Sequence, residues 1–253
     1  MTAEPSTDVN RAYYERLQLG RDDYWRKMAA PRFRVTTLLR LLSELRPRRV
    51  VDLGCGGGQL LSELKRHHPG VAFTGVDLSV NQILANRQRM PDIDWYACDL
   101  DQPLSSSLRE LTGAFDVVVA TELIEHVASP EALLGNGRIL ASPRGGRLLL
   151  TTQSGPVRET ERRVGHRRHF ETGQMNDLLA ASGWDPVSVW NCGFPFHDLS
   201  KWYANLDPDR SMRQFGEKAY GPVELAVCLF LRILFRLNSR TRGAQLVAIA
   251  SKP

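Results

Sequence analysis

Short apolar runs alternate with longer amphipathic segments through the middle of this 253-residue chain. The apolar runs are rich in β-branched residues and predict buried strands, whereas the segments between them have helical spacing. The expected strands are 48–53, 71–76, 93–98, 115–120 and 146–151, and the expected helices are 58–67, 80–89, 130–141 and 172–182. This alternation indicates parallel strands joined by right-handed crossovers, so we predict an α/β protein with a doubly wound sheet.

The pattern changes at both ends of this core. A helix over 8–19 and a helical stretch from about Asp22, with a break or kink at Pro31, predict a helical cap. Beyond a helix that stops at Gly183, strands are expected at 184–192 and 245–250, separated by a segment too long for a hairpin loop. We therefore predict a helical cap over 1–45, a ligand-binding core over 46–192, a helical lid inserted over 193–243 and the last core strand over 244–253.

The first predicted strand runs into a turn dense in glycine, 54–58. Glycines let the chain reverse from strand to helix within a few residues and bring backbone N–H groups close to a ligand. Asp52 precedes this turn, and Asp77 closes the next strand, where a doubly wound fold hydrogen-bonds a ribose diol. The dinucleotide fingerprint G-x-G-x-x-G would need glycine at Gln59, which disfavours the alternative of a nicotinamide-binding domain.

With these features, the stretch from Val50 to about Gly183 resembles class I methyltransferases, whose first motif has the form acid-x-Gly-x-Gly. The resemblance implies S-adenosylmethionine (SAM) as cofactor and a seven-stranded, mostly parallel sheet that ends in an antiparallel pair. It also implies that Asp52 attracts the ammonium and sulfonium end of SAM and that Asp77 holds the ribose hydroxyls. The other implied cofactor residues are Gly54, Cys55 and Gly56 under the methionine part, Leu78, Asp99 and Leu100 around the adenine, and Thr121 at the end of the fourth strand.

The segment after the fourth predicted strand, TELIEH, contains two carboxylates and an imidazole. If a helical turn starts there, Glu122, Glu125 and His126 share one face and suit a hard divalent cation. The Glu-x-x-Glu-His pattern is similar to the metal motif of small-RNA 3′-end 2′-O-methyltransferases and of ubiquinone-type O-methyltransferases. That resemblance implies Mg²⁺ or a similar ion and a further ligand after the fifth strand, with His166 as the candidate and His169 as the reserve.

Other roles for the same histidines stay open. Without a metal ion, His126 packs in the core and His166 is a general base or a surface residue. His166, His126 and His169 are therefore the candidate catalytic residues.

A basic run lies close to these histidines in the sequence. It is either a solvated face or a grip on a phosphate or carboxylate of the acceptor, and it consists of Arg158, Arg162, Arg163, Arg167 and Arg168. The formal net charge of +5 fits an anionic acceptor without requiring one. RNA is disfavoured because the sequence shows no recognised RNA-binding module and its aromatic residues do not interleave with basic ones.

The predicted lid contains an unusually apolar helix at 223–237, which is too short and too charged to span a bilayer. Packing against the core, packing against a homodimer mate and peripheral contact with an anionic membrane are its possible roles. Aromatic residues are dense in the lid and the cap: Phe194, Phe196, Trp202, Tyr203 and Phe215 in the former, and Tyr13, Tyr14, Tyr24 and Trp25 in the latter. The lid aromatics favour a ring or an apolar tail on the acceptor. The cap aromatics favour a cap over the cofactor mouth.

Composition adds the cellular context. The four cysteines are far apart and form no C-x-x-C pair, which predicts reduced thiols, no cysteine metal site and a cytoplasmic protein. Taken together, the sequence predicts a biosynthetic, SAM-dependent methyltransferase that methylates a hydroxyl of a small molecule such as a sugar, a catechol or a natural-product intermediate. The alternatives are an RNA 2′-O-methyltransferase, a C- or N-methyltransferase with a histidine base, and a catalytically silent SAM-fold binding partner.

Overall fold

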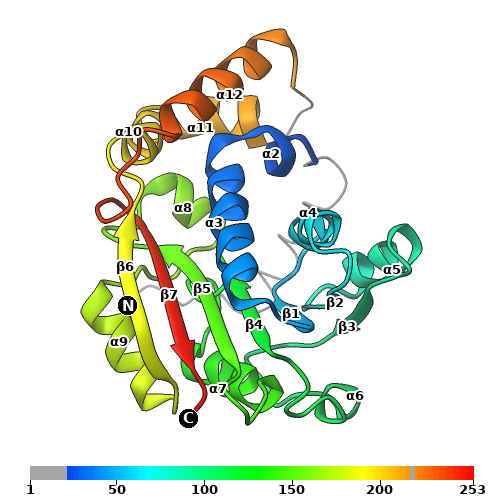
Figure 1. Ribbon diagram of the computed structural model, residues 1–253. Helices are drawn as coiled ribbons and strands as arrows, with labels where there is room; N and C mark the ends of the chain where they lie inside the picture. Colours follow the sequence, from blue (N-terminus) through cyan, green and yellow to red (C-terminus); the bar gives the residue numbers. More distant parts are fainter. Residues whose placement is uncertain (1–21, 217–219) are drawn as a thin grey trace.

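A seven-stranded sheet forms the centre of the protein, with the strand order β3-β2-β1-β4-β5-β7-β6 (Figure 1). The computed structural model describes residues 22–216 and 220–253, so the helix expected at 8–19 lies outside the described residues. The strands are β1 Arg49–Leu53, β2 Ala72–Asp77, β3 Asp94–Ala97, β4 Val117–Thr121, β5 Arg147–Gln153, β6 Asp185–Cys192 and β7 Gln245–Ser251. Strands β1 to β5 pair in parallel, whereas β7 pairs antiparallel with both β5 and β6. The predicted sheet is confirmed.

Helices cover both faces of this sheet. The helices of the described residues are α2 Asp22–Lys27, α3 Ala29–Leu45, α4 Gln59–His67, α5 Val80–Arg89, α6 Ser106–Arg109, α7 Pro130–Leu140, α8 Glu159–Arg163, α9 Thr172–Ala181, α10 Phe196–Ala204, α11 Pro208–Ser211, η2 Met212–Gly216 and α12 Pro222–Phe235. Apolar residues of α3, α4 and α5 pack on one face, and those of α6, α7 and α9 pack on the other. Each face of the sheet is therefore buried, as a parallel sheet requires.

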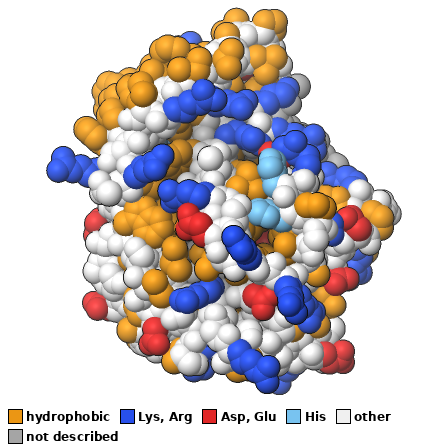
Figure 2. Space-filling view, viewed as in Figure 1, with side chains coloured by type: hydrophobic (Ala, Val, Ile, Leu, Met, Phe, Trp, Pro, Cys, Tyr) orange, Lys and Arg blue, Asp and Glu red, His pale blue; other side chains and the backbone are white. Residues whose placement is uncertain are grey.

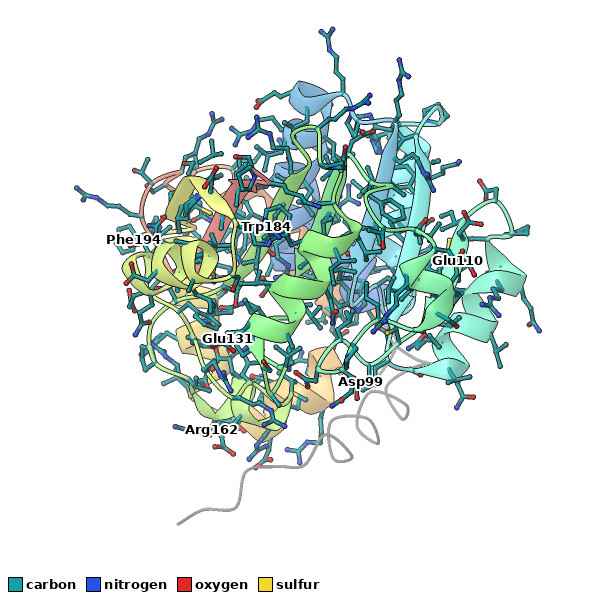
Figure 3. The ribbon with its side chains drawn as sticks, turned by 90° about the horizontal axis from the view of Figure 1, so that it is seen from below. Asp99, Glu110, Glu131, Arg162, Trp184 and Phe194 are labelled. Atoms are coloured by element: carbon teal, nitrogen blue, oxygen red, sulfur yellow. The ribbon has the colours of Figure 1, made fainter. Side chains whose placement is uncertain are left out.

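Two long-range contacts fix the lower half of the fold. Trp184, which is fully buried at the start of β6, donates its Nε1–H to the carbonyl of Leu134 on α7 at 3.0 Å (Figure 3). At the amino ends of the central strands β1 and β4, Asp116 accepts the backbone N–H groups of Arg48 and Arg49 at 2.7 and 3.0 Å. These bonds satisfy polar groups that strand pairing leaves over.

The break in the helical cap lies at Met28 and not at Pro31, so that prediction is wrong. Met28 has an extended backbone and caps α3, which places Pro31 in the first turn of that helix. Proline is tolerated there because the first N–H groups of a helix have no intrahelical partner.

The segment between β6 and β7 forms a helical layer above the carboxyl ends of the strands (Figure 1). Its last helix, α12, packs against α10 and against α2 and α3 of the cap. The apolar helix predicted over 223–237 is present but ends at Phe235, while α10, α11 and η2 were not predicted. Lid and cap thus meet above the edge of the sheet where parallel strands place ligands.

Candidate active site

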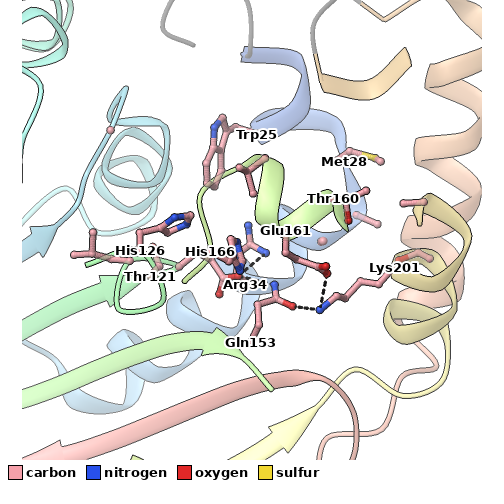
Figure 4. Close-up of a pocket in the computed structure, with 18 of the residues that line it drawn as sticks. Trp25, Met28, Arg34, Thr121, His126, Gln153, Thr160, Glu161, His166 and Lys201 are labelled. Carbon is pink, nitrogen blue, oxygen red and sulfur yellow. Dashed lines mark hydrogen bonds and ion pairs between the residues drawn. The ribbon is translucent and has the colours of Figure 1, made fainter. Parts of the chain in front are cut away.

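A cavity of about 1230 Å³ lies between the carboxyl ends of the strands, the cap and the lid (Figure 4). All the residues predicted to hold the cofactor line it: Asp52, Gly54, Cys55, Gly56, Asp77, Leu78, Asp99, Leu100 and Thr121. They come from the ends of β1, β2, β3 and β4, which the parallel pairing brings to one edge. Their individual roles toward the cofactor stay predictions.

The turn between β1 and α4 passes close under the cavity. The N–H groups of Gly54 and Cys55 both donate to the carbonyl of Val76, at 2.8 and 3.0 Å, which closes the turn onto β2. Gly54 has a φ of +74°, and a Cβ at this position would lie 2.8 Å from the side chain of Leu123. Only glycine fits here without strain.

Asp77 is held in place by the backbone around it. Its Oδ2 accepts the N–H of Gly56 at 2.8 Å, and its Oδ1 accepts the N–H of Ser79 at 2.9 Å. Burial raises the pKa of Asp77, although these hydrogen bonds oppose the shift. The carboxylate therefore stands fixed at the cavity wall with lone pairs left for a ligand.

Asp52 is a buried carboxyl at the wall of the cavity. It is 1% exposed, and its Oδ1 has no hydrogen-bond partner among the described residues. Burial, and then the charge of Asp77, raise the pKa of Asp52 well above its ordinary value. A cationic group in the cavity would offset both effects, so the site fits the ammonium and sulfonium charges of SAM.

Glu122 does not begin a helical turn. Its φ is +49°, and the residues after it form an irregular turn, so the expected arrangement of the motif along one helical face is wrong. Its carboxylate accepts Gln153 Nε2–H at 2.7 Å, Gln245 Nε2–H at 2.9 Å and Thr151 Oγ–H at 3.0 Å, and it pairs with Arg34 at 3.7 Å. Burial raises its pKa, but the charge of Arg34 and the hydrogen bonds outweigh burial and lower it to about 2.

The other three residues of the predicted metal set do lie together. One ligand atom each from Glu125, His126 and His166 falls within 4.8 Å of the others, whereas Glu122 is not part of this group. Glu125 Oε2 accepts the hydroxyl of Thr152 at 2.8 Å, and its buried Oε1 has no hydrogen-bond partner in the described part of the chain. Burial, and then the charge of Glu122, raise the pKa of Glu125. A carboxylate oxygen and two imidazole nitrogens form a donor set that a divalent ion accepts.

His166 and His169, the candidate and the reserve, form a hydrogen-bonded pair. The carbonyl of Gly155 lies 3.0 Å from His169 Nδ1, and His169 Nε2 lies 2.9 Å from His166 Nδ1. A carbonyl can only accept, so His169 is protonated on Nδ1, its Nε2 accepts, and His166 Nδ1 donates. This order leaves the Nε2 lone pair of His166 unshared with His169.

Burial keeps His126 and His166 neutral. Burial, and then His126, lower the pKa of His166 to about 2. Burial lowers the pKa of His126 to about 4. The two rings meet edge to face with their centroids 4.6 Å apart. A neutral Nε2 on His166 can accept a proton or bind a metal ion.

A polar link between the lid and the core, which no sequence motif marks, crosses the cavity. Lys201 on α10 pairs with Glu161 on α8 at 3.1 Å and donates to Gln153 Oε1 at the end of β5 (Figure 4). The side chain of Gln153 in turn holds Glu122. The three residues come from separate segments, so periodicity and spacing gave no sign of this link.

The predicted basic run does not act as one unit. Arg163 pairs with Glu159 at 3.0 Å and with Asp209, and Arg162 pairs with Glu159 at 3.7 Å. Arg167 lines the cavity.

The predicted aromatic residues are also divided. Phe196, Tyr203 and Trp25 line the cavity, while Phe194 and Trp202 are about half exposed. Tyr13 and Tyr14 lie outside the described residues, as do the side chains of Tyr24 and Phe215. Of the aromatic residues singled out in the sequence, one from the cap and two from the lid thus border the cavity.

Comparison with known proteins supplies the family. A family model described as a methyltransferase domain matches residues 24–213. The ubiquinone biosynthesis O-methyltransferase of Coxiella burnetii (strain Dugway 5J108-111) is 33% identical over 112 residues, which are 43% of this chain and 44% of that protein. The chain therefore matches less than half of the length of this curated relative.

Solved structures agree on the fold. The N-methyltransferase NodS from Bradyrhizobium japonicum WM9, in complex with S-adenosylhomocysteine, has a TM-score of 0.58 at 21% identity, covering 96% of this chain and 98% of that one. The [4+2]-cyclase SpnF has a TM-score of 0.56 at 19% identity, covering 86% of this chain and 80% of that one. Since the fold also carries cyclase chemistry, the reaction must be argued from the site. The chain belongs to the methyltransferase-domain family, which confirms the predicted class I, SAM-dependent methyltransferase family.

Proposed function

We propose that this protein transfers the methyl group of SAM to a hydroxyl oxygen of a small-molecule acceptor, such as a sugar, a catechol or a natural-product intermediate. The observation that carries the proposal is one cavity that contains both an acid-lined cofactor site and a neutral His166. When bound, SAM supplies a methyl group on a positively charged sulfur. The O-methyltransferase name of the partial relatives agrees with an oxygen acceptor.

The cofactor end of the cavity does its work through position and charge. Asp52 offers a buried, unpaired carboxylate oxygen to the cationic end of the ligand, and Asp77 offers oxygens that backbone N–H groups already orient. The turn at Gly54 lets the backbone approach without side chains in the way. Holding both reactants in line supplies most of the acceleration of a methyl transfer.

His166 is the proposed proton acceptor. A bond forms between the acceptor oxygen and the methyl carbon, the bond from carbon to sulfur breaks, and the hydroxyl proton passes to His166 Nε2. His169 keeps His166 in the tautomer that has this lone pair free. Burial and His126 oppose the imidazolium that results, and the charge of Glu122 offsets part of this opposition.

The finer proposal is a divalent-ion site formed by Glu125, His126 and His166, without Glu122. A bound Mg²⁺ or similar ion would lower the pKa of an acceptor hydroxyl and would favour catechols or vicinal diols. In that case His166 is a ligand rather than the base. The unpaired Oε1 of Glu125 and the two neutral imidazoles support this site.

Cofactor binding is tested by titrating S-adenosylhomocysteine and, separately, NADH while following the melting temperature. We expect S-adenosylhomocysteine, and not NADH, to raise the melting temperature. Asp77→Asn should weaken the affinity for S-adenosylhomocysteine at least tenfold. Asp185→Asn, at an exposed position at the start of β6, is the matched control. Stabilisation by NADH alone would contradict the proposal.

The acceptor is tested by measuring S-adenosylhomocysteine release with panels of catechols, sugars, amines and a short RNA. Turnover of a hydroxyl compound that His166→Gln lowers by at least a hundredfold supports the proposal. Turnover of amines alone would favour the N-methyltransferase alternative, and turnover of the RNA 3′ end would favour the RNA 2′-O-methyltransferase alternative.

The ion site is tested by calorimetric titration of Mg²⁺ and Mn²⁺ into chelator-treated protein with S-adenosylhomocysteine bound. Glu125→Gln should abolish saturable binding, whereas Glu122→Gln should retain it. A wild-type protein that binds neither ion would leave His166 as the base alone.

A further inference from the structure

The lid presents an apolar surface that stays largely exposed in the described part of the chain. Ten of the fifteen large hydrophobic side chains exposed among the described residues lie between residues 199 and 237. We call the surface formed by α10, α12 and Leu206, which follows α10, the lid face. On it, six apolar side chains are each between 51% and 62% exposed: Trp202, Tyr203, Leu206, Leu229, Phe230 and Ile233. Figure 2 shows hydrophobic side chains gathered over these helices. Apolar surface concentrated in this way marks an interaction site.

The lid face is not a side effect of how α12 is anchored. The opposite side of α12 holds Phe235, which is buried and meets the rings of Phe33 and His197 edge to face. Cys228, which directly precedes Leu229 in α12, is also buried. The described part of the fold is therefore satisfied without the exposed residues, so these side chains are available to a partner.

The lid face also borders the cavity. Tyr203, Leu206 and Phe230 line the cavity while each is at least 60% exposed. The apolar surface and the mouth of the site are thus continuous. Whatever covers the face is in direct reach of the cavity.

Charge identifies the occupant. Arg232 and Arg236 follow Leu229 and Ile233 by three residues each, so they adjoin the apolar strip along α12. Both are exposed, and neither has an ion pair with a described residue. The sequence contains no acidic residue after Glu224. Lys and Arg side chains border the apolar surface in Figure 2.

A second copy of the chain fits this surface poorly, because a two-fold interface would bring the arginines of one copy toward those of the other. Anionic lipid headgroups above an apolar layer match it in both respects. The contact would be peripheral: across residues 22–216 and 220–253, no helix has the length and apolar character of a membrane span.

We propose that the lid face docks on the surface of a bilayer that contains anionic lipids, with α12 lying along the interface and the cavity mouth facing the lipid. The exposed side chains of α10 and α12 enter the outer layer, and the arginines of α12 contact headgroups. This proposal does not depend on the methyl acceptor.

The test is flotation of the full-length protein with vesicles of phosphatidylcholine alone or mixed with phosphatidylglycerol. We expect binding to the mixed vesicles that is at least tenfold stronger than to phosphatidylcholine. Leu229→Ser/Ile233→Ser should weaken binding to the mixed vesicles at least tenfold, as should Arg232→Gln/Arg236→Gln, since each arginine near the surface contributes about fivefold. Melting temperatures verify that the variants fold.

Two matched controls replace exposed residues away from the lid. Leu84→Ser/Val187→Ser removes exposed apolar side chains, and Arg48→Gln/Arg144→Gln removes exposed charges at the amino ends of β1 and β5. Both should bind like the wild type. Absence of wild-type binding, or equal losses in control and lid variants, overturns the proposal. Another outcome is a wild type that binds no vesicles but self-associates in sedimentation velocity. If Leu229→Ser/Ile233→Ser then abolishes this self-association, the face belongs to a contact with a second copy.

Discussion

At the scale of single residues, the carbonyl of Gly155 sets the protonation of two side chains. It fixes the proton of His169 on Nδ1, and His169 in turn fixes that of His166. The order matters because either proposed role of His166, base or metal ligand, needs a bare Nε2. His169 is therefore a positioning residue for His166.

Removing that positioning should slow turnover without affecting the cofactor. His169→Ala frees the tautomer and ring of His166, so we expect kcat to fall about 10- to 100-fold, while the affinity for S-adenosylhomocysteine stays within twofold. Steady-state kinetics and calorimetry measure the two quantities. His67→Ala, at an exposed position on α4, is the control; equal rates in both variants would contradict the role.

The buried side chains of His126 and His166 make stability depend on pH. In the unfolded chain they titrate near 6.5, whereas burial lowers the pKa of His126 to about 4 and that of His166 to about 2. Below pH 6.5 the unfolded state binds more protons, so the free energy of unfolding falls as the pH drops toward 4, by up to about 1.4 kcal/mol per pH unit for each histidine.

Urea unfolding of chelator-treated protein at pH 7, 6 and 5 measures this loss. The raised pKa of Asp52 has the opposite effect, because it increases the free energy of unfolding as the pH falls. This effect is the same in the wild type and in the variant. The slope should therefore be shallower in His126→Gln/His166→Gln than in the wild type. Identical slopes would show that the histidines are not held neutral.

At the scale of elements, the turn between β1 and α4 is the strictest part of the site. Gly54→Ala would strain a φ of +74° and press a methyl group against Leu123. We expect a loss of about 1–3 kcal/mol in unfolding free energy and at least tenfold weaker S-adenosylhomocysteine binding. Gly70→Ala has open space around its Cβ and serves as the control in the same melting and binding experiments. If Gly54→Ala bound S-adenosylhomocysteine as the wild type does, the turn would accommodate a side chain at this position.

At the scale of the whole molecule, charged side chains hold cap, core and lid around one cavity. Arg34 of the cap pairs with Glu122 of the core, and Lys201 of the lid reaches Gln153 of the core and Glu161 of α8. Both links are mostly buried, so removing one partner leaves the other buried without compensation for its lost hydration.

Cutting the lid link should make the lid open more often. In Lys201→Met, Glu161 and Gln153 lose their partner, and we expect proteolysis within residues 193–243 to speed up at least threefold. Limited digestion followed by mass spectrometry measures the rate and the cut sites. Lys65→Met removes a more exposed ion pair with Asp92 and should leave the rate unchanged; equal acceleration in both would argue against a lid-specific link.

The sequence by itself determined the sheet and the cofactor edge, because both follow from local patterns. Strand and helix periods, the glycine turn and the acids at strand ends each lie within a few residues, and the parallel pairing then gathers Asp52, Asp77 and Asp99 at one edge. The tertiary structure alone decided where Glu122 points, since its partner Gln245 is 123 residues away and its backbone leaves the helical region. It also decided the lid link and the exposed side of α12, because contacts between distant segments depend on packing and have no period in the sequence.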